Sequence, residues 1–324
     1  MEKELKKGHL NLITDIPGLY VGNAADKEKK TGVTILIGDK PLTAGVHIMG
    51  GSPGTRETDL LSPDKMIQRV DAFVLAGGSV FGLDAASGVA DILRKNDKGY
   101  PTSASPIPIV PGAILFDLNN GGNKNWQINP YRELGRKAYK NATTNFKIGS
   151  EGAGYGANTL DLKGGLGSAS LLLQNEIRVG ALVAVNSVGS TIVNNSKNFW
   201  GAPFELDNEF GGHGLAKDFS NLEFGWENFE PFKGHSTTIG IVATNAKIDQ
   251  AQATRVAIAA HDGIARSIYP SHTPFDGDLI FAASTNQIEL AESALDLMKI
   301  GHAAANCLTR AISRAIFSAK SENS

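Results

Sequence analysis

Apolar runs rich in β-branched residues recur along the chain, and glycine-rich or polar turns separate them. Such runs predict buried strands, because β-branched side chains fit a pleated surface. The predicted strands are 32–37, 46–49, 72–76, 107–118, 179–186, 237–244 and 278–283. Between some of them, apolar residues recur with a helical period. The predicted helices are 80–93, 248–268 and 290–316. This mixture of strands and helices predicts an α/β fold.

No low-complexity linker and no solenoid-type repeat interrupts the pattern. At 324 residues the chain is long enough to bury a substantial core, and we expect a single domain, 1–324. The segments 119–124 and 207–236 are polar and weakly periodic, so we predict that they are exposed connections.

The charge balance argues against two classes of partner. There are 31 Lys and Arg against 33 Asp and Glu, without a basic face or tail, which disfavours nucleic acid and anionic membranes. Residues 1–8 lack an apolar signal core and no stretch is long enough to span a bilayer, so we expect a cytoplasmic protein. Cys307 is the single cysteine, which excludes an internal disulfide.

Two adjacent threonines, Thr237 and Thr238, begin the predicted strand 237–244 directly after the polar connection. A hydroxyl at such a junction is held by a rigid element and is still accessible, as a nucleophile must be. The alternative is that both residues serve only the β-propensity of the strand.

Two glycine-rich turns are candidates for binding. Gly77 and Gly78 follow a strand and open a helix, but the turn matches neither a dinucleotide fingerprint, nor a P-loop, nor a nucleophile elbow. Their N–H groups could bind an anion or an oxyanion; a tight packed turn is the alternative. Lys163 precedes the other turn, 164–167, and is either an active-site cation or a surface residue.

Polar side chains also stand at the ends of two predicted strands. Asn186 ends the strand 179–186 and either begins a turn or donates to a developing oxyanion. If a strand begins at Asp276, then Asp276 and Asp278 lie on the same face, since side chains alternate. Buried acids need cations, donors or a metal, whereas an exposed Asp-Gly turn would leave them solvated. The spacing of an EF-hand is absent.

Taken together, these motifs resemble the DmpA-type aminopeptidase family, which also contains the nylon-oligomer hydrolases. The resemblance covers nearly the whole chain. It rests on Thr237, the acid pair, Asn186 and the segments 51–61, 75–82, 152–154 and 162–167.

The resemblance implies a four-layer αββα sandwich of the N-terminal-nucleophile-hydrolase type. It also implies self-cleavage between Ser236 and Thr237, which gives chains 1–236 and 237–324. Thr237 would then be the nucleophile, Asp276 and Asp278 would orient its freed amine, Lys163 would assist and Asn186 would stabilise the oxyanion. No metal or cofactor is implied, and the processed units are expected to form a homotetramer.

The resemblance divides between two branches. Thr-Thr at 237–238 and the His-Thr-x-x-Asp-Gly-Asp block at 272–278 match the nylon hydrolases, whereas 54–58 looks more like the aminopeptidases. Ser236 and Phe116 depart from the nylon hydrolases, which have Asn before the nucleophile and a pocket tyrosine. The expected activity is hydrolysis of amide bonds in 6-aminohexanoate oligomers. The alternatives are an aminopeptidase or amidase for short peptides and amino-acid amides or esters, and a non-catalytic small-molecule binder.

Overall fold

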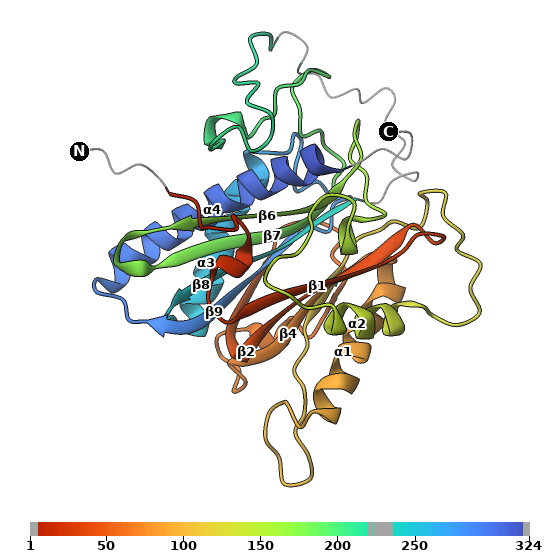
Figure 1. Ribbon diagram of the computed structural model, residues 1–324, viewed down its shortest axis with the longest axis vertical. Coiled ribbons are helices and arrows are strands. Elements are labelled where there is room, and N and C mark those ends of the chain that lie inside the picture. The colour runs from red at the N-terminus through yellow and green to blue at the C-terminus, as the bar shows by residue number, and fades with distance from the viewer. Residues whose placement is uncertain (1–5, 220–221, 223–235, 320–324) are drawn as a thin grey trace.

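One long strand, β2 (Thr31–Ile48), connects two sheets that lie face to face. The computed structural model describes residues 6–219, 222 and 236–319 (Figure 1). The first part of β2 pairs with β1 (Leu19–Asp26) and β4 (Arg69–Ala76). After a register shift between Ile37 and Leu42, its last part pairs with β9 (Leu279–Ile288). Strand β2 thus belongs to both sheets.

The sheet that begins at β9 carries the predicted nucleophile. Its order is β2-β9-β8-β7-β6, where β9 and β8 are parallel and the other pairs are antiparallel. The new strands are β8 (Thr237–Ala246), β7 (Arg178–Asn186) and β6 (Gly165–Leu172). The other sheet is completed by β5 (Gly112–Ile114) and β3 (Thr55–Arg56).

Three apolar cores separate four layers. The middle core lies between the sheets, where the rings of Phe73 and Phe281 approach to 5.1 Å. A second core joins the β6–β9 sheet to α3 (Gln250–Ala265) and α4 (Ser293–Ser318). The third joins the other sheet to α1 (Asp84–Lys95) and α2 (Tyr131–Lys140). The predicted αββα arrangement is therefore confirmed.

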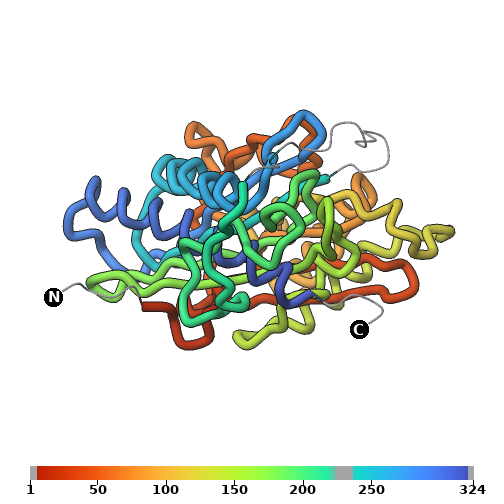
Figure 2. Tube along the Cα trace, turned by 90° about the horizontal axis from the view of Figure 1, so that it is seen from above, coloured from red at the N-terminus to blue at the C-terminus, as the bar shows by residue number. Residues whose placement is uncertain are grey.

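Two views show this layering. Helices α3 and α4 lie to one side of the strands, while α1 and α2 lie to the other (Figure 1). Seen from above, the segment that precedes α2 extends away from the sheets at the side opposite α3 and α4 (Figure 2). Short 3₁₀ turns occupy Ile13–Asp15, Asp59–Leu61, Ser79–Leu83, Gly152–Gly154, Gln174–Glu176 and Ala202–Phe204. Within the described ranges, no helix is long and apolar enough to cross a membrane.

Several predicted boundaries were wrong for local reasons. Only Gly112–Ile114 of the run 107–118 is a strand, because Pro108 and Pro111 lack the N–H that a ladder requires. The helix predicted at 80–93 begins at Asp84, after a 3₁₀ turn. The predicted strands 32–37 and 46–49 are parts of the single strand β2. Strand β1 and helix α2 were missed.

The predicted turn 164–167 is instead the beginning of β6. Its glycines allow α4 to pack directly on the strand: a Cβ at Gly167 would lie 1.9 Å from the carbonyl oxygen of Ala311. Glycine in a strand pattern resembles a turn in the sequence, although here it serves close packing.

The predicted exposed connection 207–236 is buried in part, and residues 220–221 and 223–235 lie outside the described residues. Glu209 receives two hydrogen bonds from Arg310 of α4, at 2.5 and 3.0 Å, and Arg310 is 1% exposed. Asn11 donates to the same carboxylate at 2.6 Å. Burial raises the pKa of Glu209, but the bonds and charge of Arg310 hold it below its ordinary value. This ion pair ties α4 to the rest of the chain.

We expect Arg310→Ala to lower the free energy of unfolding by about 3–5 kcal/mol, because it removes the buried cation that donates two hydrogen bonds to Glu209 and leaves this carboxylate with Asn11 and the more distant Arg314, at 3.5 Å. The measurement is the midpoint of urea unfolding, compared between variants whose dependence of the unfolding free energy on urea concentration is the same. Lys247→Ala is the matched control: it breaks the exposed pair with Glu289 and should cost less than about 1 kcal/mol. Equal losses in the two variants would contradict the assigned burial.

Candidate functional site

Thr237 is the first residue of β8, and its side chain faces the layer between the two sheets. Ile239 and Ile241, which share its face, belong to the core between the sheets. Its cross-strand partner is Asn186, the last residue of β7, so the two side chains point to the same side. Thr238 points to the opposite side and is fully buried. Of the two adjacent threonines, Thr237 therefore shares a face with a second polar group.

The Thr237 hydroxyl lies against the peptide bond that precedes it. Its Oγ1 donates a hydrogen bond to the carbonyl oxygen of Ser236 at 2.7 Å. The same oxygen accepts the backbone N–H of Gly277 at 3.0 Å. A carbonyl held between a hydroxyl and an N–H donor is polarised, and charge that develops on its oxygen meets a donor already in place.

Gly277 is a site residue that the sequence did not reveal. A β-bridge between Ser236 and Asp276 extends the parallel ladder of β8 and β9, and brings Gly277 beside Thr237. A Cβ at Gly277 would lie 2.8 Å from Thr237 Oγ1 and 2.7 Å from the carbonyl oxygen of Ser52. A side chain at 277 would therefore displace the hydroxyl, which explains why glycine separates the two acids.

Asp276 and Asp278 are 1% and 2% exposed, so the solvated Asp-Gly turn is excluded. Strand β9 begins at Leu279 rather than at Asp276, yet the bridge continues the register. Since side chains alternate, both carboxylates lie on the face opposite the Thr237 hydroxyl. They flank the Thr237 backbone, which contains its nitrogen.

Each carboxylate is held by several donors. Asp276 accepts the N–H of Val188 at 3.2 Å, and the N–H and hydroxyl of Thr273 at 3.0 and 2.6 Å. Asp278 accepts the N–H of Thr238 at 2.7 Å. Burial and the neighbouring charge of Asp278 nevertheless raise the pKa of Asp276 to about 6. Two adjacent carboxylates thus share a buried place that favours a positive charge nearby.

The start of the segment 51–61, together with Gly50, supports the loop that contains Asp276 and Asp278, which we call the acid loop. The N–H of Gly50 donates to the carbonyl of Asp278 at 3.0 Å. The N–H of Ser52 donates to the carbonyl of Asp276 at 2.8 Å, and its hydroxyl donates to the carbonyl of Pro274 at 2.9 Å. This segment therefore fixes the backbone of the acids.

Asn186, Phe116 and Lys163 lie in one neighbourhood. Asn186 Nδ2 donates to the carbonyl of Phe116 at 3.1 Å, and its Oδ1 accepts the N–H of Asn158 at 2.9 Å. Lys163 is half-buried and forms an antiparallel bridge with Asn158. The sequence-predicted polar residues are thus brought together around the start of β8.

The Gly77-Gly78 turn donates to a carboxyl group, but this group is the protein's own Asp117. The N–H of Gly78 donates to Asp117 Oδ1 at 2.8 Å, and the N–H of Gly77 to the carbonyl of Gly32 at 2.9 Å. Thr31 donates to Asp117 Oδ2 at 2.6 Å. Both amides are therefore engaged, and the geometry favours the tight-turn alternative over a substrate oxyanion site.

Asp117 itself was missed, although an acid inside the apolar run 107–118 was a signal. It is 2% exposed, and burial raises its pKa. The charges of Lys124 and Lys163 oppose this shift. Because Asp117 follows Phe116, it anchors the segment that Asn186 contacts.

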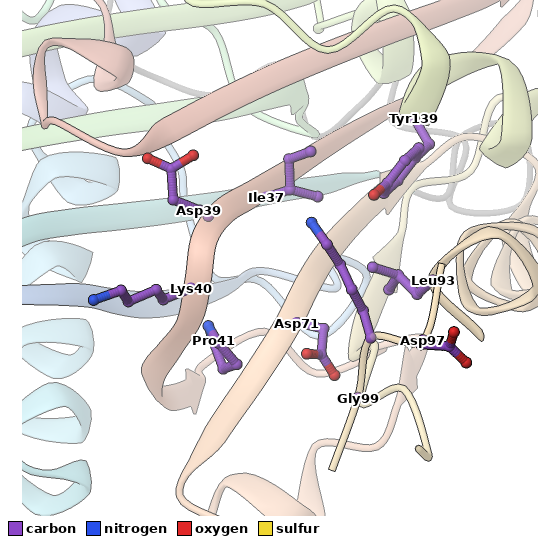
Figure 3. Close-up of a pocket in the computed structure, with 11 residues that line it drawn as sticks. Ile37, Asp39, Lys40, Pro41, Asp71, Leu93, Asp97, Gly99 and Tyr139 are labelled. Atoms are coloured by element: carbon purple, nitrogen blue, oxygen red, sulfur yellow. The ribbon is translucent and has the colours of Figure 1, made fainter. Parts of the chain in front are cut away.

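A cavity of about 230 Å³ lies elsewhere, at the bend of β2. Its lining includes Asp39, Asp71, Asp97 and Tyr139 (Figure 3). No predicted site residue lines it, and Asp71 lies at the end of β4 away from Gly77. In the part of the chain that the structure describes, no group of three or more His, Cys, Asp or Glu side chains is arranged to hold a metal ion.

The family model described as "Peptidase family S58" matches residues 11–324. The chain belongs to this family. A protein of Mycobacterium tuberculosis named as an uncharacterized aminopeptidase is 37% identical over 96% of this chain and 95% of its own length. A 6-aminohexanoate-oligomer endohydrolase of Kocuria sp. is 28% identical over 87% of this chain and 77% of its own length.

Solved structures of this family's fold agree with the αββα layers. The L-aminopeptidase D-Ala-esterase/amidase of Ochrobactrum anthropi, described as a variant of the Ntn-hydrolase fold, has a TM-score of 0.72 and 21% identity. The alignment covers 99% of the S58 chain and 89% of that structure. A Burkholderia sp. β-aminopeptidase has a TM-score of 0.69 and 22% identity, over 97% and 88% of the two chains. The fold is therefore of the N-terminal-nucleophile-hydrolase type.

The raised pKa of Asp276 predicts a pH-dependent stability, to be measured in Thr237→Ala, which removes the hydroxyl and leaves both carboxylates on the opposite face unchanged. Between the ordinary value of 3.8 and about 6, the folded state binds more protons than the unfolded state. Its stability should therefore fall as the pH rises through this range. Urea midpoints at pH 4.5 and 7 measure the fall, and adding Asp276→Asn should reduce it. If the double variant lost as much stability between pH 4.5 and 7 as Thr237→Ala does, the raised pKa would not belong to Asp276.

Proposed function

We propose that this S58 protein is a self-processing amide hydrolase whose nucleophile is Thr237. The observation that carries the proposal is the hydrogen bond from Thr237 Oγ1 to the Ser236 carbonyl, which Gly277 also holds. The hydroxyl thus lies next to the carbonyl group that it would attack. Family membership supports an amide hydrolase.

Processing would begin with attack of Thr237 Oγ1 on the carbonyl carbon of Ser236. The negative charge then develops on the oxygen that already accepts the Gly277 N–H. Cleavage of the C–N bond leaves an ester and a Thr237 amine, which receives the hydroxyl proton. Water hydrolyses the ester, and the products are the Ser236 carboxylate and a free Thr237 hydroxyl.

The freed amine would be the base for the following reactions. An α-amine has an ordinary pKa of about 7.7–8.0, so it can take the proton of its own hydroxyl near neutral pH. Asp276 and Asp278 flank the backbone at this nitrogen and would orient the amine and balance its charge. Processing would thus supply the positive charge that favours both carboxylates.

A substrate carbonyl would take the place of the Ser236 carbonyl. The Gly277 N–H would then donate to it as it does in the intact chain. Asn186, on the face of the Thr237 hydroxyl, is proposed as a further oxyanion group, and Lys163 as an electrostatic aid near Asp117. Neither role needs a metal or a cofactor. A homotetramer remains our expectation from the family.

We place short peptides and amino-acid amides before 6-aminohexanoate oligomers as substrates. The relatives named as aminopeptidases are 37% identical, whereas those named as oligomer hydrolases are 28% identical. The Thr-Thr start at 237–238 and the block at 272–278 favour the oligomers and keep them as the second candidate.

Purified protein should consist of chains 1–236 and 237–324 in denaturing mass spectrometry. Thr237→Ala should abolish this cleavage, because it removes the attacking hydroxyl. Thr238→Ala is the matched control and should still be cleaved, since the Thr238 side chain faces the other side of the sheet. A single intact species in the parent, or cleavage elsewhere, would refute the proposal.

An activity panel decides the substrate class. We expect release of p-nitroaniline from amino-acid p-nitroanilides, at a rate that falls by at least about 10²-fold in Asp276→Asn, the range for loss of one positioned acid–base group. The 6-aminohexanoate dimer and trimer, followed by chromatography, form the second arm. Faster turnover of these oligomers than of every aminoacyl amide would reverse the order of the two candidates.

A further inference from the structure

The loop before β9 contains an imidazole that neither the proposed mechanism nor the predictions use. His272 contacts Asp278 through two groups: its backbone N–H donates to Asp278 Oδ2 at 3.1 Å, and its ring Nδ1 lies 2.9 Å from the same oxygen. The His272 side chain is 14% exposed. Its φ of 55° lies in the left-handed region, which residues other than glycine adopt uncommonly. A strained backbone next to a candidate site indicates a constraint on where the ring points.

Asp278 connects this imidazole to the start of β8. While Oδ2 faces His272, Oδ1 accepts the N–H of Thr238, the residue after the proposed nucleophile, at 2.7 Å. Rotation of the carboxylate would break both contacts together. The side chain that fixes Oδ2 therefore also fixes the oxygen at the nucleophile's strand.

Two further histidines pack behind His272. The ring of His261, from α3, lies 5.1 Å from that of His272, and the ring of His47, near the end of β2, lies 5.1 Å from that of His261. His261 is 2% exposed. Among the described residues, the Nδ1 atoms of His47 and His261 and both ring nitrogens of His272 are buried without an aligned hydrogen bond. Nδ1 of His272 therefore meets Asp278 Oδ2 as a close polar contact at 2.9 Å. Three imidazoles from three elements thus form one stack that ends at Asp278.

The contacts define where the protons lie in this stack. His261 Nε2 is 3.1 Å from the carbonyl oxygen of His47, so this nitrogen carries the hydrogen. Burial lowers the pKa of His261 to about 4 and also lowers the pKa of His47, so both rings are neutral at pH 7. The stack therefore presents neutral rings to one side of His272 and a carboxylate to the other, with Asp276 next to that carboxylate.

We propose that His272 is a positioning residue for the Thr237 amine: its ring, with Nδ1 2.9 Å from Asp278 Oδ2, holds Asp278 in the orientation in which Asp278 acts on that amine. The assignment rests on the proposed function of Thr237. His261 and His47 keep the ring in place and add no charge. A metal in the stack is not supported, since no metal-holding group occurs in the described ranges.

Two substitutions separate the ring from the backbone. Asparagine tolerates the left-handed conformation and places its Nδ2–H near the position of the histidine Nδ1, so His272→Asn keeps both features. Glycine keeps only the backbone conformation, so His272→Gly removes the donor without adding strain. His9→Asn, at an exposed histidine outside the stack, is the control.

We expect His272→Gly to lower kcat on an amino-acid p-nitroanilide by about 10- to 100-fold with little change in KM, the range for partners that orient a functional group. His272→Asn should recover most of the rate, and His9→Asn should equal the parent. The proposal would be overturned if KM rose and kcat fell together in both His272 variants. Rates equal to the parent in His272→Gly would overturn it as well.

A second readout needs no turnover and therefore separates this inference from the proposed function. In the ¹⁵N-histidine spectrum of Thr237→Ala, the Nδ1 signal of His272 should move on adding Asp278→Asn, whereas that of His9 should not. The signal that disappears in His272→Asn provides the assignment. An inactive parent with this shift would refute only the proposed function. If the Nδ1 chemical shift of His272 does not change on adding Asp278→Asn, the contact between His272 and Asp278 is refuted.

Discussion

The parallel pairing between the start of β8 and the loop before β9 is the constraint on which the site depends. It places Gly277 beside Thr237, Asp276 beside Ser236 and Asp278 beside Thr238. Because side chains alternate across a strand, one pairing separates the hydroxyl from the carboxylates and puts them on opposite faces. A shift by one residue would bring a carboxylate against Thr237 Oγ1 and remove the Gly277 N–H from the Ser236 carbonyl. The register of two strands thus sets the chemistry available at this point.

The electrostatics of the acid pair favours a positive charge beside it. Two buried carboxylates with several N–H donors but no Lys or Arg among their described contacts are a costly arrangement, and the raised pKa of Asp276 expresses that cost. In the proposed function, cleavage before Thr237 creates an ammonium group at this place. The intact chain would then be poised for a product that relieves its own repulsion. This differs from the Glu209–Arg310 pair, whose charges already balance within the fold.

Scaffold and site share the same segments. The glycine-rich stretch at 50–52 binds the backbone of the acid loop, while the Gly77-Gly78 turn binds Asp117 and so supports Phe116, which Asn186 contacts. Motifs that stand out in the sequence therefore act mainly by placing other residues. Their glycines permit backbones to approach closely, which explains why nucleotide templates did not fit them.

The sequence by itself determined the α/β composition, the main strands and helices, and the family, since apolar periodicity and local motifs record which face of each element is buried. It also indicated Thr237, Asn186 and the acid pair as candidates, and their roles remain predictions. Only the tertiary structure decided that β2 spans both sheets, that Gly78 binds Asp117, that Glu209 is buried, and that Gly277 faces the Thr237 hydroxyl. His47 and His261 contact each other across 214 positions of the chain. Periodicity records local environment, whereas such partners are fixed by the packing of distant segments, which no local pattern encodes.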